Sequence, residues 1–154
     1  MAQNEKALVT DLITRAHHTA ISVKDFEAAK KFYCDVLGFV VIGDIDHRHD
    51  PGLADAVGMP EGVDCHWMML ERDGYHIELF KWYTPEGRLG PNRQCDLGYT
   101  HVAFQVKDVN EAYKRVIDAG FKTFAPPLSL RGGKAKVIYV RAPEDFITEL
   151  VEYT

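Results

Sequence analysis

The chain contains two copies of one short pattern, and similar segments follow each copy. HTAISVKD begins at His18, and HVAFQVKD begins at His101, 83 residues later. Further along, each copy is followed by an apolar segment with one glutamate: IELF contains Glu78 and TELV contains Glu149. Internal repetition is typical of a fold built from like modules. The repeat therefore predicts two equivalent units, each of which contributes one histidine and one carboxylate.

The residues between these landmarks predict the same order of elements in both copies. In the first copy, alternation and apolar runs favour strands at residues 17–23, 39–42, 67–70 and 75–82, and a helix that Asp25 caps should run to Leu37. In the second copy, strands are expected at 99–106, 121–124, 135–140 and 146–152, with a helix at 108–119. Each copy is thus a βαβββ unit.

The chain divides into an N-terminal extension (1–16), a first module (17–83), a linker (84–97) and a second module (98–154), which together form one domain of ordinary length. His18 and Glu78 are 60 positions apart, whereas His101 and Glu149 are 48 apart. The extra residues of the first module lie mostly in 43–64, which is rich in Asp, Gly, Pro and His. We expect a long connection there, and its position makes it a candidate lid.

Strand alternation predicts which way the repeated residues point. Successive side chains leave a strand on opposite faces, so His18 opposes Ile21, and Glu78 opposes Leu79. The apolar set should lie under the helices, and the histidines and glutamates on the concave side. Such polar groups are costly in an apolar cavity unless they are paired or bind a metal. Histidine and carboxylate are ligands that Zn, Ni, Co, Mn and Fe accept.

Composition narrows the class of protein. With 46% hydrophobic and 27% charged residues, the chain is typical of soluble globular proteins. A formal charge of −5 argues against a nucleic-acid partner, and no apolar run is long enough to cross a membrane. Three cysteines, Cys34, Cys65 and Cys95, are odd in number and widely spaced, which fits neither a disulfide framework nor a zinc knuckle. We expect a cytoplasmic protein in a reducing setting.

The ordered set of motifs resembles one known superfamily. H-x-A-I-x-V-K-D, a helix ending in F-Y-x-x-V-L-G-F, then I-E-L, H-V-A-F-x-V-x-D and E-L-V-E are similar, over residues 17–154, to the vicinal oxygen chelate superfamily. That superfamily includes glyoxalase I, methylmalonyl-CoA epimerase, extradiol ring-cleaving dioxygenases, and bleomycin or fosfomycin resistance proteins. The resemblance implies an α+β fold in which two tandem βαβββ modules form curved mixed sheets around a metal-binding cavity.

The resemblance also implies a ligand set, because His18, Glu78, His101 and Glu149 stand at the positions of the superfamily's metal ligands. Four ligands leave two adjacent positions of an octahedral divalent ion (Ni, Zn, Co, Mn or Fe) for two substrate oxygens. A chelated carbonyl makes the neighbouring C–H bond acidic. We therefore expect a lyase or isomerase of the glyoxalase I or epimerase type, which acts on a small 2-oxo, hemithioacetal or thioester substrate. Glu149 is the first choice for the base and Glu78 the second.

Two alternative functions remain open. An Fe(II) extradiol dioxygenase needs three open metal positions, and this requires that Glu78 does not bind. A metal-free resistance protein that sequesters a drug needs neither glutamate.

Several further residues on the inward side are candidate substrate contacts, although each also has an ordinary role as a packed or solvated side chain. They are His76, Phe80, Trp67, Gln105, Tyr139 and Arg131. His17 should lie on the opposite face from His18 and be structural. His47, Arg48 and His49 are better explained as solvated loop residues than as an anion site. In the superfamily that the chain resembles, the two modules pair either within one chain or between two chains. Of these two arrangements we expect the homodimer.

Overall fold

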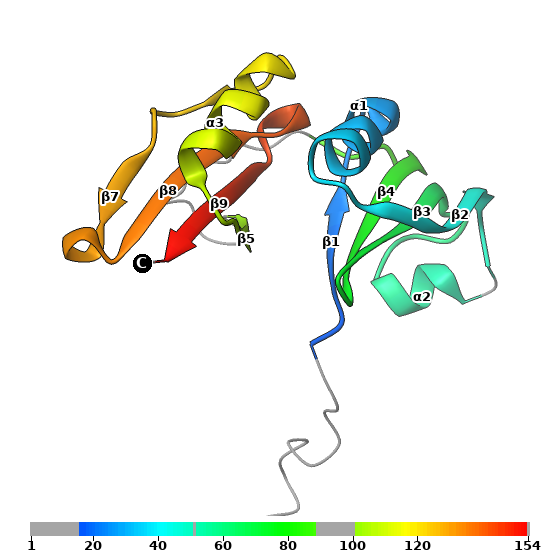
Figure 1. Ribbon diagram of the computed structural model, residues 1–154. Coiled ribbons are helices and arrows are strands. Elements are labelled where there is room, and N and C mark those ends of the chain that lie inside the picture. Colours follow the sequence, from blue (N-terminus) through cyan, green and yellow to red (C-terminus); the bar gives the residue numbers. More distant parts are fainter. Residues whose placement is uncertain (1–15, 51, 89–100, 154) are drawn as a thin grey trace, which may run out of the picture.

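The computed structural model describes residues 16–50, 52–88 and 101–153 and has the α+β fold that the repeat predicts. Figure 1 shows the two modules as separate sheets set side by side, each accompanied by its own main helix. The N-terminal extension up to residue 15 and most of the linker lie outside the described residues.

The first module contains a four-stranded mixed sheet in the order β1-β4-β3-β2. Edge strand β1 runs parallel to β4, and the other pairs are antiparallel. Its elements are β1 (His18–Ser22), α1 (Phe26–Lys31), a π-helical turn (Phe32–Val36), β2 (Val40–Arg48), α2 (Leu53–Val57), β3 (Asp64–Arg72) and β4 (Tyr75–Thr84).

The second module repeats this plan with the strand order β5-β9-β8-β6, and β7 also pairs with β8. Here β5 runs parallel to β9, as β1 does to β4. Its elements are β5 (Val102–Gln105), α3 (Val109–Asp118), β6 (Lys122–Thr123), β7 (Leu128–Leu130), β8 (Ala135–Arg141) and β9 (Ile147–Tyr153), with short 3₁₀ turns at Arg131–Gly133 and Pro143–Asp145.

Both main helices begin at an aspartate cap, of which the sequence identifies Asp25 as a cap and places Asp108 as the start of a helix. Asp25 accepts a hydrogen bond from the Ala28 backbone N–H at 3.0 Å, and Asp108 accepts one from the Glu111 backbone N–H at 3.0 Å. The hairpin between β3 and β4 turns at Asp73 and Gly74, which both have positive φ (51° and 80°). Two successive left-handed residues fit a type I′ turn, as the Asp-Gly pair predicts.

One hydrophobic core joins the helix-facing sides of the two modules. The ring of Phe39 meets Phe104 of β5 at 5.5 Å between centroids, and Tyr75 meets Phe104 at 6.0 Å. Ile21, Leu79 and Leu150, the residues expected under the helices, are all buried in this core. The alternation argument is therefore confirmed, and the opposite faces of the sheets carry the polar residues of the repeat.

The expected long connection at 43–64 is mostly wrong. β2 continues through Arg48, because residues 43–48 pair with β3, and α2 occupies Leu53–Val57. The expected helix to Leu37 ends instead in a π-helical turn, and β7 has no counterpart among the expected strands. No helix among the described residues is long and apolar enough to span a membrane.

Candidate metal centre

The first His–Glu pair joins the two parallel strands at the edge of the first sheet. His18 Nε2 lies 3.0 Å from Glu78 Oε2. Glu78 is in register with Ala20, two residues beyond His18 on the same face, and the small alanine leaves space for both side chains. Glu78 exposes 16% of its side chain, whereas His18 exposes 37%. The pair therefore presents a sheltered carboxylate beside a more open imidazole.

The second module repeats this pair almost without change. His101 Nε2 lies 3.1 Å from Glu149 Oε2, and Glu149 is in register with Ala103 on the parallel neighbour. The exposed fractions are 15% for Glu149 and 29% for His101. The sequence repeat is therefore a repeat of site geometry, in which each module presents one imidazole nitrogen and one carboxylate oxygen together.

The two pairs do not meet in one cluster within the chain. Among the residues that the structure describes, no group of three or more His, Cys, Asp or Glu side chains could hold a metal ion. Each pair lies on the sheet face turned away from the shared core. The donor chemistry suits a divalent transition ion, but two protein donors fall short of the four expected. A common centre for His18, Glu78, His101 and Glu149 therefore stays a prediction.

The surroundings of the two glutamates differ. Trp67 donates its indole N–H to Glu78 Oε1 at 2.9 Å, and the Arg48 guanidinium carbon lies 5.2 Å from the centre of the indole ring. In the second module, Tyr139 packs edge-on against His101, with ring centroids 5.4 Å apart. Trp67 and Tyr139, both expected as substrate contacts, thus touch a glutamate and a histidine of the pairs.

Two more histidines gather beside the first pair. The ring of His17 stacks on His76, with centroids 4.8 Å apart, and His17 Nδ1 lies 2.8 Å from His18 Nδ1. His17 precedes β1, so strand alternation does not apply to it, and its expected place on the opposite face is wrong. His76, one of the expected contact residues, stacks on His17, and its role as a contact stays a prediction.

An apolar hollow of about 310 Å³ lies on the second sheet beside Tyr139. Its rim consists of side chains that are about half exposed, with Phe124 at 59%, Leu128 at 52% and Leu130 at 45%. The sequence argument missed these residues, because β7 is only three residues long and Phe124 stands at the end of an expected strand with no sign that it faces a hollow. On the first sheet, Phe80 stacks on Trp82 with centroids 5.3 Å apart, on the Glu78 face.

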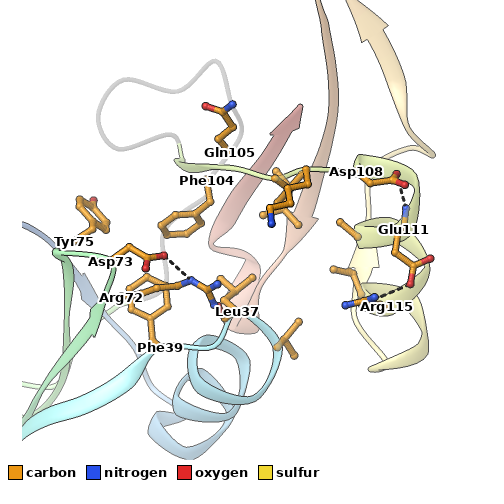
Figure 2. A pocket seen from close by; sticks show the side chains of 16 residues that line it. Leu37, Phe39, Arg72, Asp73, Tyr75, Phe104, Gln105, Asp108, Glu111 and Arg115 are labelled. Carbon is orange, nitrogen blue, oxygen red and sulfur yellow. Dashed lines mark hydrogen bonds and ion pairs between the residues drawn. The ribbon is translucent and has the colours of Figure 1, made fainter. Parts of the chain in front are cut away.

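A larger hollow of about 820 Å³ lies between the modules, on the helix side. Figure 2 shows several of its charged residues: Arg72 and Asp73 come from the β3–β4 hairpin, and Glu111 and Arg115 from α3. These charges pair with each other, since Arg72 Nε lies 3.3 Å from Asp73 and Arg115 Nε 2.9 Å from Glu111. Gln105 borders this hollow, but its side chain shares a strand face with Ala103, which is in register with Glu149. The side chain of Arg131, the remaining expected contact, lies outside the described part.

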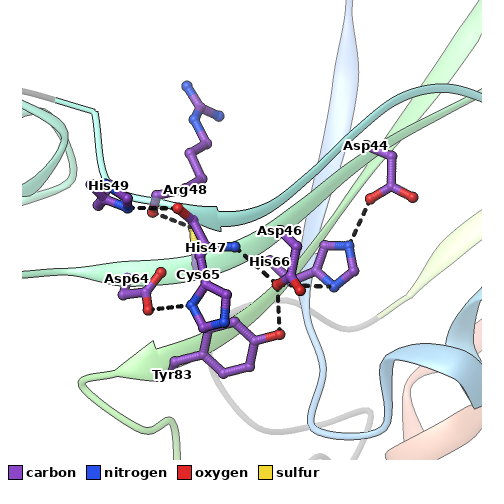
Figure 3. Close-up of polar contacts among 9 residues, drawn as sticks. All are labelled: Asp44, Asp46, His47, Arg48, His49, Asp64, Cys65, His66 and Tyr83. Carbon is purple, nitrogen blue, oxygen red and sulfur yellow. Dashed lines mark hydrogen bonds and ion pairs between the residues drawn. The ribbon is translucent and has the colours of Figure 1, made fainter.

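A polar network occupies the far end of the first sheet (Figure 3). His47 Nδ1 lies 2.7 Å from Asp64 Oδ2, and this hydrogen bond raises the pKa of His47. Tyr83 donates to Asp46 at 2.8 Å, and this contact lowers the pKa of Asp46. Arg48 pairs with Asp50, and His49 contacts the His47 carbonyl oxygen. All three residues of the 47–49 run thus form polar contacts with nearby residues of the same sheet or the same loop.

Comparisons with known proteins agree on one superfamily. The family model of the Glyoxalase/Bleomycin resistance protein/Dioxygenase superfamily matches residues 15–150. A probable lactoylglutathione lyase from Synechocystis is 26% identical over 136 residues, which cover 88% of this chain and 92% of that protein. The uncharacterised protein YaeR of Escherichia coli is 34% identical over 101 residues, which cover 65% of this chain and 67% of YaeR.

Solved structures show the same fold. A glyoxalase family protein from Bacillus cereus superposes with a TM-score of 0.80 at 21% identity and covers 96% of this chain and 99% of that one. The fosfomycin resistance protein FosX from Listeria monocytogenes, solved with Mn(II) and sulfate, superposes with a TM-score of 0.61 at 18% identity and covers 92% of this chain and 94% of that one.

Proposed function

Because the chain belongs to the Glyoxalase/Bleomycin resistance protein/Dioxygenase superfamily, we propose that it is a divalent-metal-dependent lyase or isomerase of the glyoxalase I or epimerase type. The observation that carries this proposal is the duplicated pair, with His Nε2 to Glu Oε2 distances of 3.0 Å and 3.1 Å at equivalent strand positions. The curated relative named a probable lactoylglutathione lyase supports the same reaction class.

The proposed reaction moves one proton on a small 2-oxo, hemithioacetal or thioester substrate. His18, Glu78, His101 and Glu149 would hold the ion, which when bound supplies positive charge to a substrate carbonyl. A glutamate oxygen accepts the proton from the neighbouring carbon, and the electron pair of that C–H bond moves toward the carbonyl. The same carboxyl group then returns the proton to carbon, so no oxidant or reductant is consumed.

We propose that two copies of the chain complete each site. The shared core fastens the modules by their helix-facing sides, and both His–Glu pairs face away from it. Each of these outward faces exposes an apolar side chain that a second copy would cover, Ile45 at 46% on the first sheet and Tyr153 at 51% on the second. A twofold dimer would oppose the first module of one copy to the second module of the other and so bring four ligands together twice.

The surroundings of Glu78 also favour proton transfer over extradiol ring cleavage. A ring-cleaving dioxygenase would need Glu78 to leave the ion. Glu78 Oε2, however, faces His18 while Trp67 holds Oε1, and this orientation suits a permanent ligand. Cys34 and Cys65 are free thiols, in keeping with the cytosolic setting that we propose.

The test is a metal analysis of the purified, untagged chain without chelators, followed by the same analysis of Glu78→Ala. We expect about one divalent ion per chain in the parent and weaker binding in the variant. Hemithioacetal and thioester substrates should then incorporate solvent deuterium at carbon without net oxidation. If Glu78→Ala instead keeps Fe(II) with the parent affinity and consumes oxygen with catechols, the protein is a ring-cleaving dioxygenase. If the parent binds no metal, the proposal is wrong.

A further inference from the structure

The two modules hold their glutamates differently, although the His–Glu distances are nearly equal. Glu78 has both oxygens engaged: Oε2 faces His18 at 3.0 Å, and Oε1 accepts the Trp67 indole N–H at 2.9 Å. Glu149 Oε2 faces His101 at 3.1 Å, but among the described residues no donor reaches its Oε1. The second oxygen of each carboxylate is therefore the point at which the two halves diverge.

The strand register explains this difference. On β3, Trp67 pairs with Phe80, the residue two positions beyond Glu78. On β8, the equivalent residue is Val137, which pairs with Val151, two positions beyond Glu149. Valine has no polar hydrogen and cannot donate to a carboxylate. The repeat thus supplies an internal comparison, in which one module has a donor at this place and the other has an apolar side chain.

The indole itself is held in place from two sides. Gly43 of β2 lies against the ring, and a Cβ atom there would come within 2.8 Å of Trp67 Cη2. The Arg48 guanidinium stands 5.2 Å from the ring centre and is anchored by Asp50, whose Oδ2 is 2.7 Å from Arg48 Nε. A fixed donor of this kind restrains the carboxylate that it contacts, because turning Glu78 would break a charge-assisted hydrogen bond.

We propose, on the basis of the proposed function, that Trp67 is a positioning residue that divides the work between the two glutamates. Its indole N–H holds Oε1, so that Glu78 would bind the ion as a fixed ligand through Oε2, the oxygen that faces His18. Glu149, which has no such donor among the described residues, would be the less restrained carboxylate and the one that carries the proton. Groups that orient a metal ligand in this way change metal affinity when they are removed, although they do not touch the metal.

The test uses Co(II) as the probe in the full-length chain and compares two variants of the same chemistry. Trp67→Phe removes the donor to Glu78 and keeps an aromatic ring. Trp82→Phe is the matched control, because the Trp82 indole N–H donates to Ser22 Oγ at 3.1 Å. We expect Trp67→Phe to weaken Co(II) binding roughly 10- to 100-fold and to alter the visible cobalt spectrum. Trp82→Phe should keep the parent affinity and spectrum.

The Trp82→Phe chain also has Trp67 as its one remaining tryptophan, since the sequence contains two. Its fluorescence should change as Co(II) is added, because the indole contacts a ligand of the ion. In a second comparison, Glu78→Gln should lose more Co(II) affinity than Glu149→Gln. Equal cobalt affinity in Trp67→Phe and Trp82→Phe, or a greater loss in Glu149→Gln, would overturn this inference and leave the proposed function standing. A parent chain that binds no Co(II) would overturn both.

Discussion

Phe32 of the first module packs edge-on against Phe121 of the second, with ring centroids 4.8 Å apart and Phe32 fully buried. Phe32 opens the π-helical turn after α1, and Phe121 follows Gly120, which comes after the end of α3. The contact therefore joins the helical segment of the first module to the residues that follow α3 in the second. The two rings pack in the shared core, on the side of each sheet opposite to the His–Glu pairs.

Phe32→Ala should destabilise the whole chain, because it empties a site in the core that the modules share. Truncation of a buried phenylalanine typically costs about 3–5 kcal/mol in the free energy of unfolding. Urea unfolding followed by circular dichroism measures this loss. Phe124→Ala is the control, since Phe124 is 59% exposed, and it should change the free energy by less than about 1 kcal/mol. Equal effects of the two substitutions would contradict a common core.

The sequence predicts the repeated architecture well, because local signals and the repeat agree. Asp25 caps the first helix, the second helix begins at Asp108, and the alternation around Ile21 and Leu79 separates the core face from the polar face, as expected. These features depend on neighbours along the chain or on a period of two, so one sequence is enough to find them.

Other features depend on pairing across strands, which the sequence does not reveal. Residues 43–48 contain Gly, Asp and His and have the composition of a loop, yet pairing with β3 makes them a strand. The indole contact from Trp67 to Glu78 joins side chains on neighbouring strands, and the place of His17 depends on where β1 begins. Which His–Glu pair faces which depends on whether the modules pair within one chain or between two chains. The sequence does not decide between these two arrangements.

A mixture of two inactive variants tests whether each site forms between two chains. Glu78→Ala and Glu149→Ala should each bind metal poorly when separate. In a mixed dimer with exchanged modules, both substitutions fall in one site and the other site is intact. After unfolding and refolding together, random pairing should restore about a quarter of the parent's high-affinity sites. Metal analysis and size-exclusion chromatography measure this recovery. If mixing restores nothing although dimers form, the site lies within one chain.

Stability should depend on pH through His47. Its pKa is raised above the ordinary value of 6.5, chiefly by the hydrogen bond with Asp64 and secondly by that carboxylate's charge. The folded chain therefore holds this proton more tightly than the unfolded chain. The resulting stabilisation is fully present below pH 6.5 and is lost as pH rises through the raised folded value.

His47→Asn removes this effect and tolerates the left-handed backbone at position 47, where φ is 52°. We expect the variant to unfold at lower urea concentration than the parent at about pH 5, and the gap to narrow by about pH 9. His49→Asn is the control, because the His49 ring contacts a backbone carbonyl oxygen and no carboxylate. A gap that widens as pH rises would show that the sign of the linkage is wrong.

Gly43→Ala should disturb the metal centre without changing any polar group. The added Cβ would stand 2.8 Å from Trp67 Cη2 and 2.9 Å from Cζ3, so the ring must move. Moving the ring breaks or lengthens the 2.9 Å hydrogen bond to Glu78. We expect a changed near-ultraviolet circular dichroism signal from the indole and weaker Co(II) binding in the same direction as Trp67→Phe. Gly87→Ala is the control, because a Cβ there meets no atom within 4 Å. If both variants bind Co(II) equally well while the indole signal of Gly43→Ala still changes, the ring can move without consequence for the ion, and Glu78 holds its position by itself.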